Sequence, residues 1–308
     1  MNGRPPRLPP LNALRVFHTV VQHRSFRSAA SELSVTPQAV SQQIKLLEEA
    51  LGVELFLRKG RAIEPNEQAI LLAHFVQAGF DELHEGVRRV AKGSARNRIN
   101  VNASPYFATR YLLDRIGRFH ETAPDADLRL TTMVNLPDFV SDDVDVAIQW
   151  GFGGWKGLDS TLLVRDHKEI CCTPDLAGKI GAPADLLNLP LLHPVLSAEF
   201  WRKVLAHLGV GGAIPAGRDL QFQDAATMRR AALAGLGVGL VSTIDAEEDL
   251  KLGRLVAPLG RGALAAMAPE EVPGFYLVLP RAHRRVRAIS AFCAWVETED
   301  WTLPAREF

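Results

Sequence analysis

Four polar side chains that recur within one short segment are the residues best suited to recognition chemistry: Gln38, Ser41, Gln42 and Lys45. Amide, hydroxyl and ammonium groups make the hydrogen bonds that distinguish base pairs in the DNA major groove, and Gln suits the adenine edge. Spacings of three and four residues place all four on one face of a helix. The pattern indicates a helix that reads DNA sequence, although a polar helix face can also be merely solvated.

Two short helices joined by a tight turn must position these groups, within residues 25–48. Thr36 can cap the second helix, and Pro37 suits its first position because a missing N–H costs nothing there. Apolar residues at helical spacing give both helices an inward face: Ala29, Ala30, Leu33, Val40, Ile44 and Leu47. This is the layout of a helix-turn-helix whose second helix enters a major groove.

A β-hairpin is predicted directly after the second helix. Gly52 stops the helix, a short strand runs to Phe56, and a returning strand begins at Ala62. The turn between them carries three cations, Arg58, Lys59 and Arg61. Cations at a hairpin tip suit phosphate or minor-groove contact, which fixes register without reading sequence.

From Leu11 to Val90 the sequence resembles the winged helix-turn-helix and linker helix of the LysR-type transcriptional regulators, and the resemblance continues through the rest of the chain. The segments 8–14 (LPPLNAL) and 24–26 (RSF) are similar to the branch that contains glycine-cleavage and β-lactamase-gene activators. The resemblance implies a dimer or tetramer that binds an interrupted inverted repeat, responds to a small-molecule effector and recruits RNA polymerase. The predicted DNA contacts are Arg27, Thr36, Pro37, Gln38, Ser41, Gln42, Lys45, Arg58, Lys59 and Arg61.

Two departures from the family pattern affect helix caps. Arg27 stands where the family usually has a small hydroxyl residue that caps the helix, so Ser25 or Ser28 must cap it or the helix end is uncapped. Asn66 precedes the linker helix and can cap it. Neither departure threatens the fold, but Arg27 could alter phosphate contacts.

The charge is distributed unevenly along a chain whose net charge is zero. Residues 1–65 hold nine Lys or Arg against five Asp or Glu, whereas residues 99–308 hold 21 against 26. A basic head on an acidic body is typical of a DNA-binding module attached to another module. The absence of a signal core or a long apolar run predicts a cytoplasmic protein with no membrane contact.

A single long helix is predicted over residues 66–92. Its apolar residues fall at spacings of three and four, which is typical of a coiled-coil seam, although a helix packed on its own domain gives the same pattern. We expect a dimer through Leu72, Val76, Phe80, Leu83 and Val87, followed by a polar hinge at residues 93–97.

The remaining residues, 98–308, alternate between predicted strands and helices. Strands at 99–103, 128–132 and 144–148, with a helix from about Thr109 to His120, indicate a parallel β-α-β-α-β half. The pattern predicts two lobes, the first at about 98–165 and 275–308 and the second at about 166–274. The full chain is therefore predicted to be an α+β multidomain protein: a winged helix-turn-helix over 1–65, a linker helix over 66–92, and an α/β effector domain similar to periplasmic binding proteins.

Ligands of open α/β sheets bind beyond the carboxyl ends of the strands, here in a cleft between the lobes. Ser104 opens a helix and could hold a carboxylate, while Asp224 would repel anions and favour an amine. Both can equally be helix caps. Together they indicate an amino-acid- or peptide-like effector, and the predicted contacts are Ser104, Pro105, Tyr106, Thr132, Met133, Gln149, Trp150, Gln223 and Asp224.

No pattern indicates catalysis, a metal site or a cofactor. The glycine-rich run 235–240 ends a helix and enters a strand, the reverse of a nucleotide-binding loop. Cys171 and Cys172 are adjacent and lack metal-ligand spacing, so buried thiols or a redox role remain open. The leading hypothesis is a ligand-controlled transcriptional regulator rather than an enzyme; the alternative is a small-molecule binding protein with a helical dimerisation arm and no DNA role.

Overall fold

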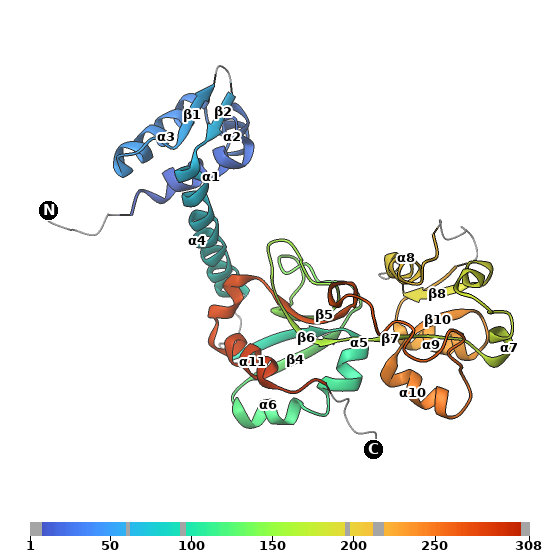
Figure 1. Ribbon diagram of the computed structural model, residues 1–308. Helices are drawn as coiled ribbons and strands as arrows, with labels where there is room; N and C mark the ends of the chain where they lie inside the picture. The colour runs from blue at the N-terminus through green and yellow to red at the C-terminus, as the bar shows by residue number, and fades with distance from the viewer. Residues whose placement is uncertain (1–7, 60–61, 93–96, 195–197, 212–218, 303–308) are drawn as a thin grey trace. The chain divides into compact units, whose positions relative to one another are not determined.

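The computed structural model describes residues 8–59, 62–92, 97–194, 198–211 and 219–302 of the 308-residue chain (Figure 1). The chain divides into two compact units, Met1–Ser94 and Ala95–Phe308. Each unit has hydrophobic cores of its own.

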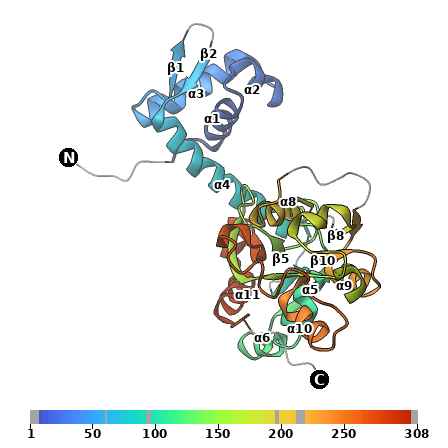
Figure 2. The same cartoon turned by 45° about the vertical axis from the view of Figure 1, so that its right-hand side comes forward.

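Three helices and a two-stranded hairpin form most of the N-terminal unit: α1 Leu11–His23, α2 Phe26–Glu32, α3 Pro37–Leu51, β1 Phe56–Lys59 and β2 Ala62–Pro65. Local capping sets the ends of the helices. The Ser25 hydroxyl accepts from the Ser28 N–H at 3.2 Å and the Thr36 hydroxyl from the Ala39 N–H at 3.2 Å. Ser25 therefore caps α2 in spite of Arg27, and the predicted winged helix-turn-helix is confirmed. Figure 2 shows the hairpin projecting beyond the three helices.

The hairpin is held to the helices by aromatic contacts. The Phe56 ring of β1 lies 5.8 Å from that of Phe17 in α1 and 6.1 Å from that of Phe26 in α2, centre to centre. Val40, Ile44 and Leu47 of α3 are buried in the same core, as predicted. The outer face of α3 is thereby fixed relative to the wing.

Helix α4 spans Glu67–Lys92, and the preceding residue, Asn66, makes two hydrogen bonds with its side-chain amide. Asn66 Oδ1 accepts from the Ala69 N–H at 2.9 Å, and Asn66 Nδ2 donates to the Glu54 carbonyl at 2.7 Å. The predicted dimer seam is only partly available. Val76 is buried in the core of the N-terminal unit and Leu72 and Phe80 pack against it, so this part of the predicted seam contacts its own domain, and its role in a dimer stays a prediction. The apolar period identified an inward face but not the partner that covers it.

Other apolar side chains of α4 remain exposed. Leu83 and Val87 of the predicted seam are 52% and 68% exposed. Nearer the start of the helix, Leu71 and Phe75 are 62% and 66% exposed, with Ile70 beside them. Leu71 and Phe75 lie four residues apart and form one surface. We call Ile70, Leu71 and Phe75 the α4 stripe.

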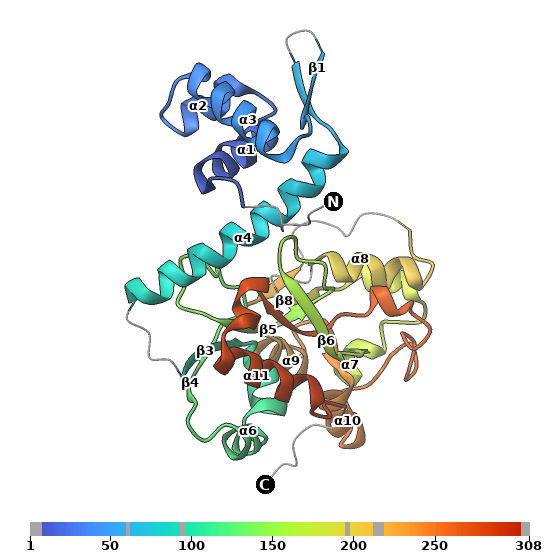
Figure 3. The ribbon, with the colours of Figure 1, turned by 90° about the vertical axis from the view of Figure 1, so that its left-hand side faces the viewer.

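The first lobe of the C-terminal unit is a five-stranded sheet ordered β4-β3-β5-β11-β6. Its strands are β3 Arg98–Ala103, β4 Asp127–Thr132, β5 Val146–Gly151, β6 Asp159–Arg165 and β11 Gly274–Leu279. The associated helices are α5 Pro105–Phe107, the π-helix η1 Ala108–Leu112, α6 Ile116–Thr122, the 3₁₀ helix η5 Arg281–Arg285 and α11 Arg287–Thr298. Helices α6 and α11 cover one face of the sheet (Figure 3).

The second lobe is a four-stranded sheet ordered β7-β10-β8-β9. Its strands are β7 Lys168–Cys171, β8 Leu191–Pro194, β9 Leu220–Phe222 and β10 Val238–Ser242. Its helices are α7 Pro174–Ala177, α8 Ala198–His207, α9 Ala225–Leu233 and α10 Thr243–Lys251, with 3₁₀ turns η2 Pro183–Asn188 and η4 Pro269–Glu271. Gly237, in the glycine-rich run, lies so close to the Pro190 carbonyl that a Cβ atom would clash. This run therefore serves packing.

The predicted β-α-β-α-β half is wrong in two respects. No helix joins β4 to β5, because residues 133–145 are irregular, and the predicted helix from Thr109 to His120 is instead η1 and α6 separated by a turn. The sheet is also mixed: β3 is parallel to β4 and β5, but β11 is antiparallel to both β5 and β6. A strand from residues 275–308, which were assigned to this lobe, thus inserts between β5 and β6 in the antiparallel direction, which local sequence patterns do not reveal.

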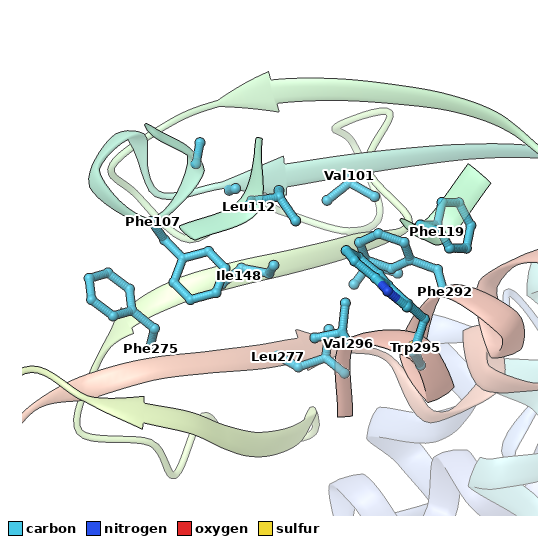
Figure 4. Close-up of a cluster of buried hydrophobic side chains, with 14 of the residues drawn as sticks. Val101, Phe107, Leu112, Phe119, Ile148, Phe275, Leu277, Phe292, Trp295 and Val296 are labelled. Carbon is cyan, nitrogen blue, oxygen red and sulfur yellow. The ribbon is translucent and has the colours of Figure 1, made fainter. Parts of the chain in front are cut away.

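The largest core lies between the first sheet and its covering helices. Figure 4 shows Phe119 of α6 and Phe292 and Trp295 of α11 packed over Val101, Ile148 and Leu277. The Phe119 and Phe292 rings meet edge-to-face at 5.2 Å. This core makes the first sheet a rigid support for the side chains at its strand ends.

Candidate functional site

The outer face of α3 presents most of the predicted reading residues. Gln38, Gln42 and Lys45 are exposed, and Ser41 is half-buried. The Lys45 ammonium makes an exposed ion pair of 3.7 Å with Glu49. Thr36 and Pro37 are exposed at the start of the helix, but the Thr36 hydroxyl is committed to capping. Gln38 and Gln42, one turn apart, are therefore the side chains best placed to read base edges.

The structure describes only some of the basic side chains that were predicted to contact DNA. Arg27 is exposed in the first turn of α2. Arg58 and Lys59 belong to the end of β1, where their backbones pair with Ile63 and Ala62 of β2. The side chains of Arg58 and Lys59, and all of Arg61, lie outside the described residues. Their role in holding DNA stays a prediction.

A cleft lies between the two lobes of the C-terminal unit. Its walls include the end of β3, the end of β5, the crossover from β6 to β7, and the start of α9. The lining combines aromatic and apolar groups with a few polar ones: Ser104, Pro105, Tyr106, Val134, Trp150, Asp166, Lys168, Pro194, Phe200, Gln223, Asp224, Ala225, Leu240 and Phe275. Such a lining is typical of a small-molecule site.

Six of the nine predicted effector contacts line this cleft: Ser104, Pro105, Tyr106, Trp150, Gln223 and Asp224. Thr132 and Met133 do not; both are exposed at the end of the edge strand β4, and Val134 lines the cleft in their place. Gln149 does not line it either, because successive strand residues point to opposite faces and Trp150 takes the cleft side. Thr132, Met133 and Gln149 thus do not line the cleft in this structure, and their contact with an effector stays a prediction.

The polar network at the crossover was missed by sequence reasoning. The carboxylate of Asp166 accepts from Trp150 Nε1 at 2.7 Å and from the Ser242 hydroxyl at 2.6 Å, and pairs with Lys168 Nζ at 2.5 Å. Lys168 also donates to Ser242 at 2.9 Å. The network joins β5 of the first lobe to β7 and β10 of the second. Asp166 and Lys168 belong to no predicted strand end. Only the opposite charges of these two residues, two positions apart, could have suggested the network.

Tyr106 presents an unusual donor to the cleft. Its ring stacks on Phe275 with centres 5.9 Å apart and planes 6° from parallel. Its hydroxyl is buried beside the Ser242 hydroxyl, whose hydrogen bonding acts to lower the phenol pKa, although this contact falls outside ordinary hydrogen-bond geometry. Burial, followed by the negative charges of Asp245 and Asp166, raises the phenol pKa well above its usual range. Tyr106 therefore stays a neutral hydroxyl that can donate to a ligand.

The two residues predicted to select an amino-acid-like ligand differ in how they are used. The Asp224 carboxylate caps α9, accepting from the N–H and the hydroxyl of Thr227 at 2.9 Å each. The Ser104 hydroxyl makes no cap bond, and the helix that follows has only three residues. The Ser104 hydroxyl is therefore available to hydrogen-bond a ligand. The Asp224 carboxylate can still attract a cation, although it already accepts two hydrogen bonds from Thr227.

The three thiols lie in cores rather than in the cleft. Burial raises the thiol pKa of Cys171 to about 12 and those of Cys172 and Cys293 to about 11. A raised pKa means less thiolate, so at pH 8 reactivity should fall by at least about a hundredfold relative to an exposed cysteine. We expect a disulfide reagent to label all three thiols promptly in urea but none in the native protein. Rapid labelling of Cys171 or Cys172 in the native state would instead support a redox role.

Over the described ranges, no group of His, Cys, Asp and Glu could hold a metal ion, and no helix is long and apolar enough to cross a membrane.

Both units match known family models. Residues 11–69 match the model described as "Bacterial regulatory helix-turn-helix protein, lysR family", and residues 92–301 match "LysR substrate binding domain". The first match supports DNA binding, which the alternative of a binding protein without a DNA role does not explain.

Similar proteins span almost the whole chain. The glycine cleavage system transcriptional activator of Escherichia coli K12 is 35% identical over 293 residues, covering 94% of this chain and 93% of that protein. The transcriptional activator AmpR of Rhodobacter capsulatus is 32% identical over 287 residues, covering 93% and 96%. Among solved structures, the effector domain of AmpR from Pseudomonas aeruginosa aligns with a TM-score of 0.54 and 27% identity, over 65% of this chain and 94% of that one.

Proposed function

This chain belongs to the LysR family of bacterial DNA-binding transcriptional regulators, and we propose that its dimer reads an interrupted inverted repeat under the control of an amino-acid- or peptide-like effector. The DNA-binding and effector-binding modules follow from the family. The reading residues, the dimer surface and the effector class are the proposal. Because its target is chromosomal DNA, this role is a cytoplasmic one.

In the proposed complex, Gln38 and Gln42 contact base edges while Arg27, Lys45 and the wing cations Arg58, Lys59 and Arg61 hold the backbone. Exposure of the two amides one turn apart on α3 supports this division. The head has only a small excess of positive charge, nine Lys or Arg against five Asp or Glu over residues 1–65. Two heads on one duplex would add their phosphate contacts, which supports a dimer.

The α4 stripe is the proposed dimer surface, together with Leu83 and Val87. Its large apolar side chains are more than half exposed, which is unusual for a monomer. A two-fold arrangement would bury the same residues from both copies. Pairs of dimers would extend this to a tetramer that bends DNA and recruits RNA polymerase.

The effector proposal is carried by one observation: the lobes share a cleft lined by the network of Asp166 and Lys168 and by the buried Tyr106 side chain. Lys168 is already neutralised by Asp166, so the cleft does not favour a simple anion. Asp224 favours an amine, and the Tyr106 hydroxyl can donate to a carbonyl or carboxylate oxygen. Ser242, the hydroxyl bonded to Lys168 and Asp166, is not among the lining residues, which supports a binding role rather than catalysis.

A thermal-shift measurement on the full-length chain tests this proposal. Free amino acids and dipeptides should raise the melting temperature by several degrees at saturating concentration, and simple carboxylates without an amine should not. Tyr106→Phe should weaken binding about tenfold, because one hydrogen bond to the ligand is lost. Thr132→Ala, at an exposed position outside the cleft, should leave binding unchanged. Weaker binding in Thr132→Ala together with unchanged binding in Tyr106→Phe would refute the cleft as the effector site.

A further inference from the structure

Two buried amide side chains in the first lobe lack the hydrogen bonds that burial normally demands. Asn102 is 0% exposed, and neither its Oδ1 nor its Nδ2 has a partner among the described residues. Gln149 is 2% exposed, and its Oε1 is likewise unpartnered there. Buried polar atoms are almost always paired, so three orphans in one sheet call for a ligand or solvent that pairs with them.

The two side chains lie on the same face of adjacent strands. In the parallel pair β3 and β5, Asn102 is opposite Ala147, and Gln149 lies two residues further along β5. This makes Asn102 and Gln149 diagonal neighbours. Figure 4 shows Val101 and Ile148, one residue earlier on each strand, directed into the aromatic core. Because strand side chains alternate, Asn102 and Gln149 point to the other face.

This face adjoins the effector cleft. Ser104, two residues beyond Asn102, lines the cleft. Gln149 Nε2 donates to the Val134 carbonyl at 2.8 Å, and Val134 also lines the cleft. The amide pair is therefore one hydrogen bond behind the cleft wall. The wall at this point is the start of the irregular segment 133–145, which packs on the sheet further along through Phe139 and Val144.

The unsatisfied groups define a chemical complement. They are two acceptor oxygens, Asn102 Oδ1 and Gln149 Oε1, and one donor, the Asn102 NH₂ group. A carboxylate would face two acceptors that repel it. A carboxamide offers two N–H donors and one carbonyl acceptor, which matches the set, and it adds no buried charge.

We propose that Asn102 and Gln149 form a subsite of the effector cleft that binds an uncharged amide group, reached when the segment at Val134 shifts. This inference rests on the proposed function, because it specifies the effector as one that carries an amide. Asn102 and Gln149 are then the residues that select amide over acid.

Calorimetric titration of the full-length protein with L-glutamine and L-glutamate tests the subsite, since these probes differ only in a side-chain amide or carboxylate. Wild type should bind glutamine at least about tenfold more tightly, as expected for hydrogen bonds that the acid cannot make. Asn102→Leu should reduce this preference to about twofold or less. Asn100→Leu makes the same change two residues earlier on the same face of β3, and this variant should retain the preference for glutamine.

Gln149→Met provides a second variant should Asn102→Leu fold poorly, and it should also reduce the preference. An unchanged preference in both variants overturns the subsite. A higher melting temperature of Asn102→Leu without a change in preference means that the pair holds water only, and also overturns it. Equal binding of both probes, lost in Tyr106→Phe, overturns the subsite but preserves the cleft. Binding of neither probe by wild type contradicts both the subsite and the proposed effector class.

Discussion

Phe75→Glu is expected to separate the dimer into monomers and to weaken operator binding at least about a hundredfold, because two linked heads gain that much or more over one. Phe75 is 66% exposed and forms the α4 stripe with Ile70 and Leu71. A carboxylate there would lie buried and unpaired in a two-fold interface. Analytical ultracentrifugation gives the mass, and fluorescence anisotropy on a full inverted repeat gives the affinity.

Phe75→Leu supplies the matched control, since it keeps an apolar side chain and should keep the dimer. Circular dichroism should show that both variants retain the helical content of wild type, because Phe75 is not part of the N-terminal core. A Phe75→Glu protein that stays dimeric would contradict the α4 stripe as part of the dimer surface.

Gln38→Ala is expected to lower affinity for the cognate operator by about 5- to 150-fold, while affinity for random DNA stays within about twofold. The loss corresponds to about 1–3 kcal/mol for one base-edge contact. Arg61→Ala should weaken binding to both duplexes by a similar factor and reduce the slope of log affinity against log salt by about one. Parallel titrations on cognate and scrambled duplexes measure both effects. Equal losses on the two duplexes for both variants would remove α3 as the reading helix.

The N-terminal unit was predictable because its signals are local. Thr36 with Pro37, and Gly52 at φ +70°, mark the ends of α3 within the residues that form it. The Ser25 hydroxyl caps α2 by accepting a hydrogen bond from the Ser28 N–H, so Arg27 had little effect on the fold. The exposed face of α3 followed from the buried positions Val40, Ile44 and Leu47.

The errors arose where a partner lies far away in sequence. The apolar period of α4 was real, but Leu72, Val76 and Phe80 pack against their own domain, and the period alone could not distinguish such a contact from one with a second helix. In the first lobe, β11 lies in the lobe to which residues 275–308 were assigned, but its antiparallel pairing with β5 and β6 was not predicted, because a local β-α-β pattern does not show where a distant strand inserts. The same strand brings Phe275 to the cleft, where it stacks on Tyr106.

The sequence analysis predicted the cleft residues that lie at the ends of strands. It missed those in the crossover from β6 to β7. Ser104, Trp150 and Asp224 were found because they follow recognisable strands. Asp166 and Lys168 were missed because a crossover has no periodic signal, although it must pass between the lobes. Gln149 was assigned to the cleft for its position, whereas strand alternation buries it behind the wall.

The decisive measurement is the affinity of the full-length dimer for a duplex selected by the protein from random sequence and for a scrambled duplex of the same length and composition, over a range of salt concentrations. We expect the selected duplex to bear an interrupted inverted repeat and to bind at least about a thousandfold more tightly, with affinity for both duplexes falling steeply as salt rises. Equal affinity for the two duplexes, or an affinity independent of salt, would contradict a dimer that reads DNA through Gln38 and Gln42.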